Sequence, residues 1–304
     1  DSRKDKDIYF YSTDRILREL YGIPNFLPLN VYPYHGPYIL DYELGYENAQ
    51  HRCPVLVTRT SQERYLRDRG VEAYSIGSLF ANYRNYKRIE KSENSRGTLA
   101  FPSHSTELID VVLDWDDYAD ALLALPDEFQ PVGVCMYWKD MVKGAYRHFI
   151  DKGINVYCAG HYSDLDFVDN FYSIIRNFKY TTGNMVGSHA YYAVEMGIPY
   201  FLYGPSPCYN NFGGDPARKS GTYSIKDLEY GSIEHYFCRF PDEEVKLHNR
   251  TIEYTCEILG IGQQTPRSVV RNAILRSGLR YAAAASINCT TDILKRVYRK
   301  LSRL

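Results

Sequence analysis

The feature that most constrains the fold is a regular alternation of apolar and amphipathic segments between residues 98 and 203. Five short apolar segments have strand length, and most of the segments between them have helical periodicity. This alternation is typical of a doubly wound parallel sheet with helices on both faces, whose ligands bind beyond the carboxyl ends of the strands. The expected strands cover residues 98–102, 132–137, 155–159, 180–182 and 199–203, and the expected helices cover 116–125, 141–152, 167–177 and 187–196.

The flanking segments predict a smaller α/β domain before this sheet and basic helices after it. The charged stretch 84–98 has almost no apolar content and predicts an exposed linker. We therefore expect a small α/β domain over 1–95, a Rossmann-like domain over 96–262 and a basic helical tail over 263–304. Further expected elements are strands at 8–11, 54–58 and 71–76, helices at 13–21 and 62–70 (the second capped by Ser61), a loop after 207, more helix at 224–260, and two basic helices at 267–281 and 291–304.

The cysteines and the apolar segments indicate the cellular setting in which the chain folds. The seven cysteines are scattered and form no C-x-x-C pair, which favours reduced thiols in a cytosolic setting over zinc or a redox dithiol. No apolar run approaches the roughly 20 residues that a membrane-spanning helix needs. The chain starts without methionine, which leaves open that it is a fragment. Its 30 tyrosines suit half-wet, sugar-binding surfaces, although a compositional habit of the source explains them as well.

The charge is concentrated at the C-terminus. Residues 263–304 contain nine Lys or Arg and one acid, a charge of +8, whereas the remaining chain carries −9. Such a tail favours a polyanionic partner, and we expect an anionic membrane surface. An ordinary solvated or partner-binding helix pair is the alternative. Nucleic acid is not expected, because the basic residues are confined to the tail and no aromatic–basic motif accompanies them.

The strongest local signal is the segment TTGNMVGSHAYYAVEMGIPYFLYG at 181–204. It predicts a strand, a turn at Gly183 and Asn184, and a helix that opens with Gly187, Ser188 and His189. The first turn of a helix has unpaired N–H groups and a partial positive charge, so a small residue and a hydroxyl there allow a phosphate to approach. The alternative is that Gly187 only allows close packing and that Ser188 only caps the helix.

Polar residues follow other strands too. Hydroxyls and an imidazole in the loop FPSHSTEL, and a further imidazole in AGHYSD, could contact a diphosphate, sugar or nucleobase, although caps and surface loops use the same residues. His35, in the N-terminal loop YPYHGPY, could accept a proton at neutral pH, with Glu107 and Asp164 as weaker candidate bases. The candidate ligand contacts in these loops are Ser103, His104, Ser105, Thr106, Lys139 and His161.

Several motifs are absent. The chain has no P-loop lysine motif, no G-x-G-x-x-G, no nucleophile elbow and no H-E-x-x-H. It also lacks D-x-D, so a metal-bound diphosphate is not indicated. We expect no metal and no cofactor, with phosphate held by helix N–H groups, hydroxyls, imidazoles and Lys139.

Taken together, residues 101–204 resemble the C-terminal, donor-binding half of the GT-B glycosyltransferases, and most of all uncharacterised transferases of polysaccharide and capsule gene clusters. The segments FPSHST, CMYWKD (135–140), AGHYSD and the one at 181–204 carry this resemblance. It implies that Gly187, Ser188 and His189 contact a nucleotide-sugar donor, and that His35 is the candidate base on the acceptor side.

The resemblance implies a metal-independent glycosyltransferase that moves a sugar from a nucleotide-sugar to a glycan or lipid-linked acceptor in surface polysaccharide biosynthesis. We expect it to be cytoplasmic and peripheral on the inner face of the membrane. Two alternatives stay open: a nucleotide-sugar epimerase or hydrolase of the same fold, and a non-catalytic, transferase-like binding subunit.

Overall fold

The computed structural model describes residues 10–34, 36–37, 53–215, 220–224 and 229–301, with 229–232 and 287–301 described by their backbone alone. His35 lies outside the described residues.

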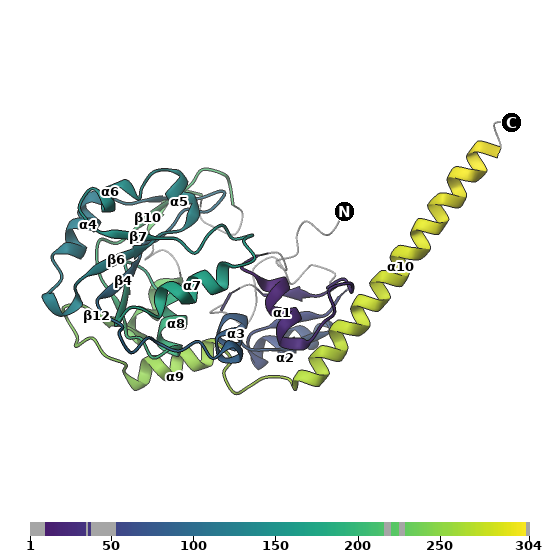
Figure 1. The fold of residues 1–304 in the computed structure, drawn as a ribbon, viewed down its shortest axis with the longest axis horizontal. Coiled ribbons are helices and arrows are strands. Elements are labelled where there is room, and N and C mark those ends of the chain that lie inside the picture. The colour runs from purple at the N-terminus through teal and green to yellow at the C-terminus, as the bar shows by residue number, and fades with distance from the viewer. Residues whose placement is uncertain (1–9, 35, 38–52, 216–219, 225–228, 302–304) are drawn as a thin grey trace.

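The molecule is built around a six-stranded, entirely parallel sheet, which confirms the expected mixed α/β class with a mostly parallel sheet (Figure 1). From the central strand β4 the chain moves outward through β6 and β7, then returns to the other side of β4 for β8, β9 and β12. This order is that of a Rossmann sheet, and it places the topological switch point between β4 and β8. The strands, in spatial order, are β12 (Cys238–Arg239), β9 (Tyr200–Leu202), β8 (Tyr180–Gly183), β4 (Thr98–Phe101), β6 (Val132–Cys135) and β7 (Asn155–Tyr157).

Both faces of this sheet are buried. Leu99 and Phe101 of β4 belong to one apolar cluster with side chains of helices α7 and α8, whereas Ala100 belongs to a second cluster with side chains of α4 and α6. Because successive residues of a strand point to opposite faces, this division shows that the sheet is covered on both sides. The helices are α4 (Trp115–Leu123), α5 (Trp138–Val142), α6 (Arg147–Ile150), α7 (Phe167–Ile175) and α8 (Ser188–Glu195).

One expected helix is divided. The prediction of a single helix over 141–152 is wrong, because two short helices, α5 and α6, are separated by a turn at Gly144. Gly144 has a φ of 88°, a left-handed conformation that interrupts a helix and that glycine adopts at little cost.

The N-terminal region forms a second, three-stranded parallel sheet of β1 (Tyr32–Pro33), β2 (Val55–Val57) and β3 (Ala73–Ser75). Helix α1 (Thr13–Tyr21) ends at Gly22, as expected, and helix α2 is Thr60–Arg67. Ser61 is not the cap of α2: the N-cap is Arg59, two residues earlier, and the Gln62 side chain accepts from the backbone N–H groups of Thr58 and Arg59. Of the strand expected at 8–11, Phe10 and Tyr11 form a bend and a turn, and the rest lies outside the described residues.

The charged stretch is not all linker. Residues 84–87 belong to helix α3 (Leu79–Lys87), and Arg84 is buried, with its guanidinium paired to Glu195 of α8 at 2.7 and 2.8 Å. Charge alone suggested exposure, but this partner allows the side chain to be buried. Residues 88–97 have no helix or strand.

A small antiparallel sheet lies beside the main one. It contains β11 (Gly221–Ser224), β10 (Cys208–Asn211) and β5 (Asp110–Val112), so the loop expected after residue 207 begins as a strand. The partners β5 and β10 are almost one hundred residues apart in the sequence, so local sequence patterns do not reveal their pairing.

The C-terminal segment returns to the N-terminal sheet. After the 3-10 helix η4 (Glu229–Tyr236), the strand β12 and helix α9 (Asn249–Ile258), a single helix α10 spans Arg267–Leu301. Its first turns pack on the N-terminal region through bonds from Asn30 to Ser277 (2.9 Å) and from Arg271 to the carbonyl of Tyr21 (3.0 Å), and its end projects from the body (Figure 1). Two helices were expected, but the intervening run of four alanines from Ala282 favours continuous helix.

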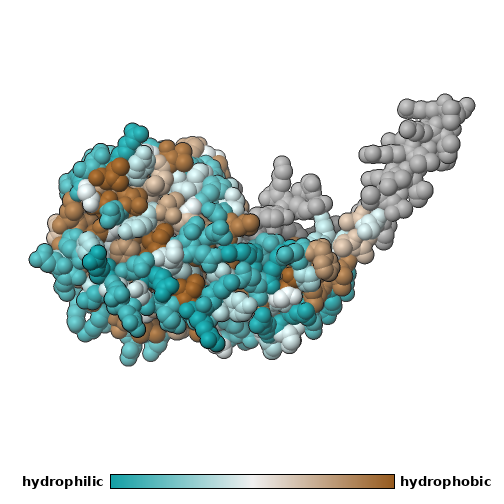
Figure 2. All heavy atoms as spheres, viewed as in Figure 1, coloured by the Kyte–Doolittle hydropathy of each residue, from teal (hydrophilic) through white to brown (hydrophobic). Residues whose placement is uncertain are grey.

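The surface in this view is largely hydrophilic, with apolar groups gathered over the region of α5, α6 and β10 (Figure 2). Among the described residues, no helix combines the length and apolarity that crossing a bilayer requires.

Candidate functional site

The loops that follow β4 and β8 meet at the switch point. Asn184 is buried, and its Oδ1 accepts from both the N–H and the hydroxyl of Ser103 at 2.9 Å, while its Nδ2 donates to the carbonyl of Pro205 at 3.1 Å. The structure therefore brings together Ser103 and Asn184, both predicted to contact the ligand, and the two residues hydrogen-bond to each other. Together they fix the loops after β4, β8 and β9 at one edge of the sheet.

The start of α8 is open. Gly187 is the N-cap residue without a capping side chain, and the N–H groups of Ser188 and His189 donate to no acceptor within the described part of the chain. Ser188 is exposed, and Gly187 and His189 are half-buried. Unpaired N–H groups at a helix start attract an anion, so this end can receive a phosphate.

The N-terminal loop lies opposite this helix start. A Cβ placed on Gly36 would lie 3.8 Å from the hydroxyl of Ser188. Gly36 therefore lies close to the predicted phosphate site.

His189 is neutral and fixed. Its ring stacks on Phe101, with 4.5 Å between ring centroids and 16° between planes. Burial, and secondarily the neighbouring His104, lowers the pKa of His189 to about 3. The ring also lies over Gly187, where a Cβ would come within 2.8 Å of it. His189 can thus offer a neutral imidazole, while the glycine leaves room for it.

Aromatic side chains line the neighbouring strand ends. The ring of His104 lies 4.4 Å from that of Tyr137, and the ring of His161 lies 4.3 Å from Trp138 and 4.0 Å from Tyr162. We call these residues, from the loops after β4, β6 and β7, the aromatic ledge. The structure therefore brings together the predicted contacts His104 and His161, and it adds three aromatic residues that sequence reasoning did not single out.

The N-terminal region also reaches the aromatic ledge. The N–H of Tyr11 donates to the carbonyl of Tyr162 at 2.6 Å, and the ring of Phe10 lies 4.9 Å from that of Tyr162. The ledge is thus bordered by both parts of the molecule.

The remaining predicted residues lie around the same edge. Lys139 donates to the carbonyl of Thr106 and pairs with the largely exposed carboxylate of Glu107 at 3.4 Å. Asp164 instead accepts from the N–H of Asp166 at 2.9 Å within a turn. Of the two carboxylates proposed as bases, Glu107 is thus the more accessible.

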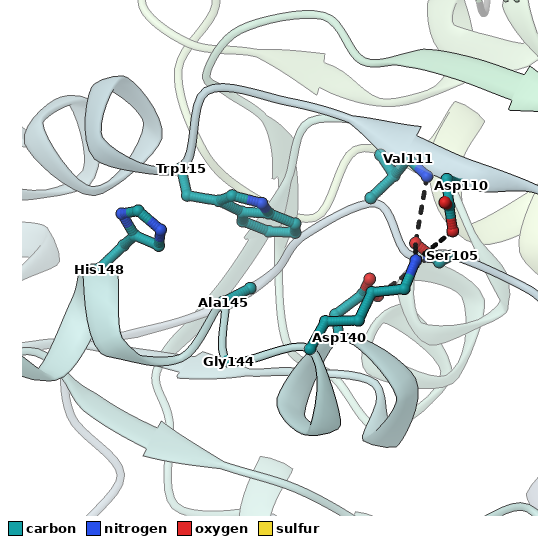
Figure 3. A pocket seen from close by; sticks show the side chains of 9 residues that line it. Ser105, Asp110, Val111, Trp115, Asp140, Gly144, Ala145 and His148 are labelled. Atoms are coloured by element: carbon teal, nitrogen blue, oxygen red, sulfur yellow. Dashed lines mark hydrogen bonds and ion pairs between the residues drawn. The ribbon is translucent and has the colours of Figure 1, made fainter.

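A cavity of about 210 Å³ opens beside these loops, between the ends of β4 and β6 and the small sheet (Figure 3). The predicted contact Ser105 lies here: its N–H donates to Asp140 at 2.9 Å, and its hydroxyl accepts from the N–H of Val111 at 3.1 Å and lies 3.3 Å from the Lys143 ammonium. Lys143 also pairs with Asp110. We call this the side cavity, and its lining residues are Ser105, Asp110, Val111, Trp115, Asp140, Lys143, Gly144, Ala145 and His148.

Sequence reasoning missed the carboxylates of this cavity. Asp140 lies in the first turn of α5, beside Lys139 and in the segment that follows β6, and this position is a signal that could have identified it. Asp110 gives no such signal, because it reaches the cavity only through the pairing of β5 with β10.

A group of potential metal ligands lies elsewhere. In the described residues, atoms of Cys238, Glu243 and His248 lie within 4.8 Å of one another at the edge strand β12 and in the segment after it. Glu243 already pairs with Arg250, and the Cys238 thiol lies near the carbonyls of Glu244 and Lys246. No ligand group in this cluster belongs to the loops of the switch point.

The sheet order and the loops at its carboxyl edge define the architecture as a Rossmann-like α/β protein with a ligand edge at the switch point. No family model matches the chain, and no curated protein matches it. Among solved structures, the chain is similar to the S. aureus MnaA–UDP co-structure, with 11% sequence identity and a TM-score of 0.35; the match covers 63% of this chain and 62% of that chain. A likeness this distant says nothing about activity.

Proposed function

We propose that the protein is a metal-independent glycosyltransferase that binds a nucleotide-sugar at the switch point. The observation that carries the proposal is the open start of α8, whose free N–H groups and exposed Ser188 lie at the sheet edge where α/β proteins bind nucleotides. An anionic phosphate is the group that such a helix start stabilises best.

The surrounding residues support a nucleotide-sugar rather than phosphate alone. The aromatic ledge offers ring faces on which a base or a sugar can stack. The neutral His189 adds a hydrogen-bonding group without a charge. Hydroxyls and imidazoles in the loops after β4 and β7 would complete the site.

In the proposed reaction, the bond between the sugar C1 and the phosphate oxygen breaks, and a bond forms between C1 and an acceptor hydroxyl. The electron pair of the broken bond goes to the leaving phosphate, whose charge the N–H groups of α8 stabilise. The hydroxyl proton passes to a base. His35, which lies outside the described residues and next to Gly36 in the sequence, is our first candidate, followed by Glu107 and Asp164.

The experiment that tests this proposal is a thermal-shift screen against UDP-, GDP-, CMP- and dTDP-sugars, followed by calorimetry with the ligand that binds. Ser188→Ala should lower the affinity for that ligand about fivefold to tenfold. A hydrogen bond to a charged group contributes about 1.5 kcal/mol, or somewhat less where a water molecule takes the place of the lost hydroxyl. The matched control is Ser173→Ala on α7, whose hydroxyl bonds to its own helix at Asn170. Equal affinities for wild type and Ser188→Ala would contradict the assignment.

Measuring consumption of the donor distinguishes the transferase from the two alternative functions. A transferase consumes the donor rapidly only when a glycan or lipid-linked acceptor is present. Rapid consumption of donor alone would instead favour the epimerase or hydrolase, and binding without turnover would favour a non-catalytic subunit.

A further inference from the structure

We propose that the side cavity is a saccharide subsite that holds a single sugar ring. The inference rests on the proposed function, because it adds the carbohydrate end of the substrate to the phosphate site at α8. The size, the polar groups and the aromatic wall of the cavity all fit such a ring.

The volume fits one ring. At about 210 Å³ the cavity is smaller than the roughly 300–1,000 Å³ of pockets that enclose drug-sized ligands. It is therefore too small for a nucleotide-sugar or an oligosaccharide as a whole, and we assign it a single monosaccharide unit.

The polar groups are held in place before any ligand arrives. Asp140 is 2% exposed, and one of its oxygens is fixed by the N–H of Ser105 at 2.9 Å. The Lys143 ammonium lies between Asp110 and the Ser105 hydroxyl. A fixed set of carboxylate acceptors and one ammonium donor is suited to sugar hydroxyls, each of which both donates and accepts.

The charge of the wall argues against a second phosphate. Asp110 and Asp140 contribute two negative charges, Lys143 contributes one positive charge, and His148 is engaged with Asp116 at 3.0 Å. The lining without His148 is therefore net negative. A neutral polyhydroxylated ring meets no such repulsion.

Trp115 supplies an apolar wall. Its indole packs edge-on against the buried Phe149, with ring centroids 6.1 Å apart, and Figure 3 shows it between His148 and the group of Ser105, Asp110 and Asp140. A large aromatic side chain with one polar atom suits the C–H face of a pyranose. Carboxylates on one side and an indole on another match the two kinds of surface on a sugar ring.

One loop connects the subsite to the phosphate site. Ser103 bonds to Asn184 at the switch point, His104 belongs to the aromatic ledge, and Ser105 lines the side cavity. The ring could therefore be the donor sugar or the terminal unit of an acceptor glycan, and the experiment distinguishes these sources.

The test uses the full chain with Trp115→Ala, Trp115→Phe and Asp140→Asn, and with Asp151→Asn as a control carboxylate that is exposed and outside the cavity. Probes are methyl glycosides of glucose, galactose, mannose and N-acetylglucosamine, followed by saturation-transfer NMR, and UDP with UDP-glucose and UDP-N-acetylglucosamine, followed by calorimetry. Trp115→Phe keeps an aromatic face and guards against misfolding of the alanine variant. Thermal unfolding of every variant confirms the native fold.

We expect Trp115→Ala and Asp140→Asn to weaken saccharide binding at least tenfold, Trp115→Phe to weaken it less, and the control to leave it unchanged. If the ring is the donor sugar, the variants abolish the extra affinity of a UDP-sugar over UDP. If it is an acceptor unit, they abolish binding of the methyl glycoside and leave both nucleotide affinities unchanged.

The inference is overturned if the folded variants bind every saccharide probe as the wild type does, or if the wild type binds none. Nucleotide binding without a Trp115-dependent saccharide would remove the subsite and leave the proposed function standing. Saccharide binding that depends on Trp115, without binding of any nucleotide in the thermal-shift screen, would keep the subsite and remove the proposed function.

Discussion

At the scale of single residues, His189 combines burial beside the switch point with a strongly lowered pKa. Its ring is enclosed between Phe101 and the backbone at Gly187, and this burial lowers its pKa from 6.5 to about 3. In the unfolded chain the same imidazole takes up a proton at mildly acidic pH. We therefore expect His189 to stay neutral in the folded protein at physiological pH.

This histidine predicts a pH dependence of stability. Between pH 6.5 and 3 the unfolded state binds a proton that the folded state does not, so the free energy of unfolding should fall as the pH falls, by up to about 1.4 kcal/mol per pH unit from this residue. His189→Phe should remove that part of the slope. Urea unfolding at pH 7, 6 and 5 measures it, with the exposed His235→Gln as control. Identical slopes for wild type and His189→Phe would disprove the assigned burial.

At the scale of elements, α3 and α8 are joined by one buried ion pair. The guanidinium of Arg84 and the carboxylate of Glu195 are 10% and 6% exposed, and they make two hydrogen bonds. Glu195 stands at the end of α8 opposite Ser188, so it fixes the helix to the N-terminal region and leaves the other end for a ligand.

Breaking this pair on one side should be costly. Arg84→Met leaves a buried carboxylate without its partner, and we expect a loss of about 3 kcal/mol in the free energy of unfolding. The double variant Arg84→Met/Glu195→Leu should recover most of that loss. Denaturant unfolding measures both, and Lys246→Met, which removes an exposed pair with Glu244, should cost less than about 1 kcal/mol. A double variant as unstable as the single one would show that packing, not charge, explains the effect.

At the same scale, the elements differ in how well hydrophobic periodicity in the sequence predicts them. Five of the six strands of the main sheet are predicted from sequence, because short apolar segments alternate there with segments of helical periodicity. The parallel arrangement then places Ser103, His104, His161 and Asn184 at one edge, which is why these residues could be grouped from sequence. The side cavity could not be predicted, because Asp110 reaches it only through a short strand whose partner is distant in the chain.

At the scale of the whole molecule, α10 divides into a packed part and a projecting part. Val270, Ala273 and Ile274 are fully or almost fully buried, and Arg276 pairs with Glu72 at 3.6 Å. Two of the nine basic residues expected in the tail, Arg271 and Arg276, are thus engaged within the protein. The basic residues beyond position 290 remain our proposed contact with an anionic surface.

Membrane binding can be tested without disturbing the packed part of α10. The substitutions Lys295→Glu, Arg296→Glu, Arg299→Glu and Lys300→Glu reverse the charge at the projecting end, and each basic residue near an anionic surface contributes about 1 kcal/mol. We expect the wild type to sediment with phosphatidylserine-containing vesicles at low salt and the quadruple variant to remain in solution. Phosphatidylcholine vesicles are the control, and salt-insensitive binding would contradict an electrostatic contact.

The return of α10 has one more consequence. A single apolar cluster includes Leu17 of α1, Tyr83 of α3, Leu99 of β4, Ala190 of α8 and Ile274 of α10, so both parallel sheets draw on the same interior. The chain also crosses between its two halves twice, once through residues 88–97 and once on the way into α10. The two sheets are therefore joined by a common interior and by two chain crossings, so we expect their relative position to be fixed by folding rather than by binding of a ligand.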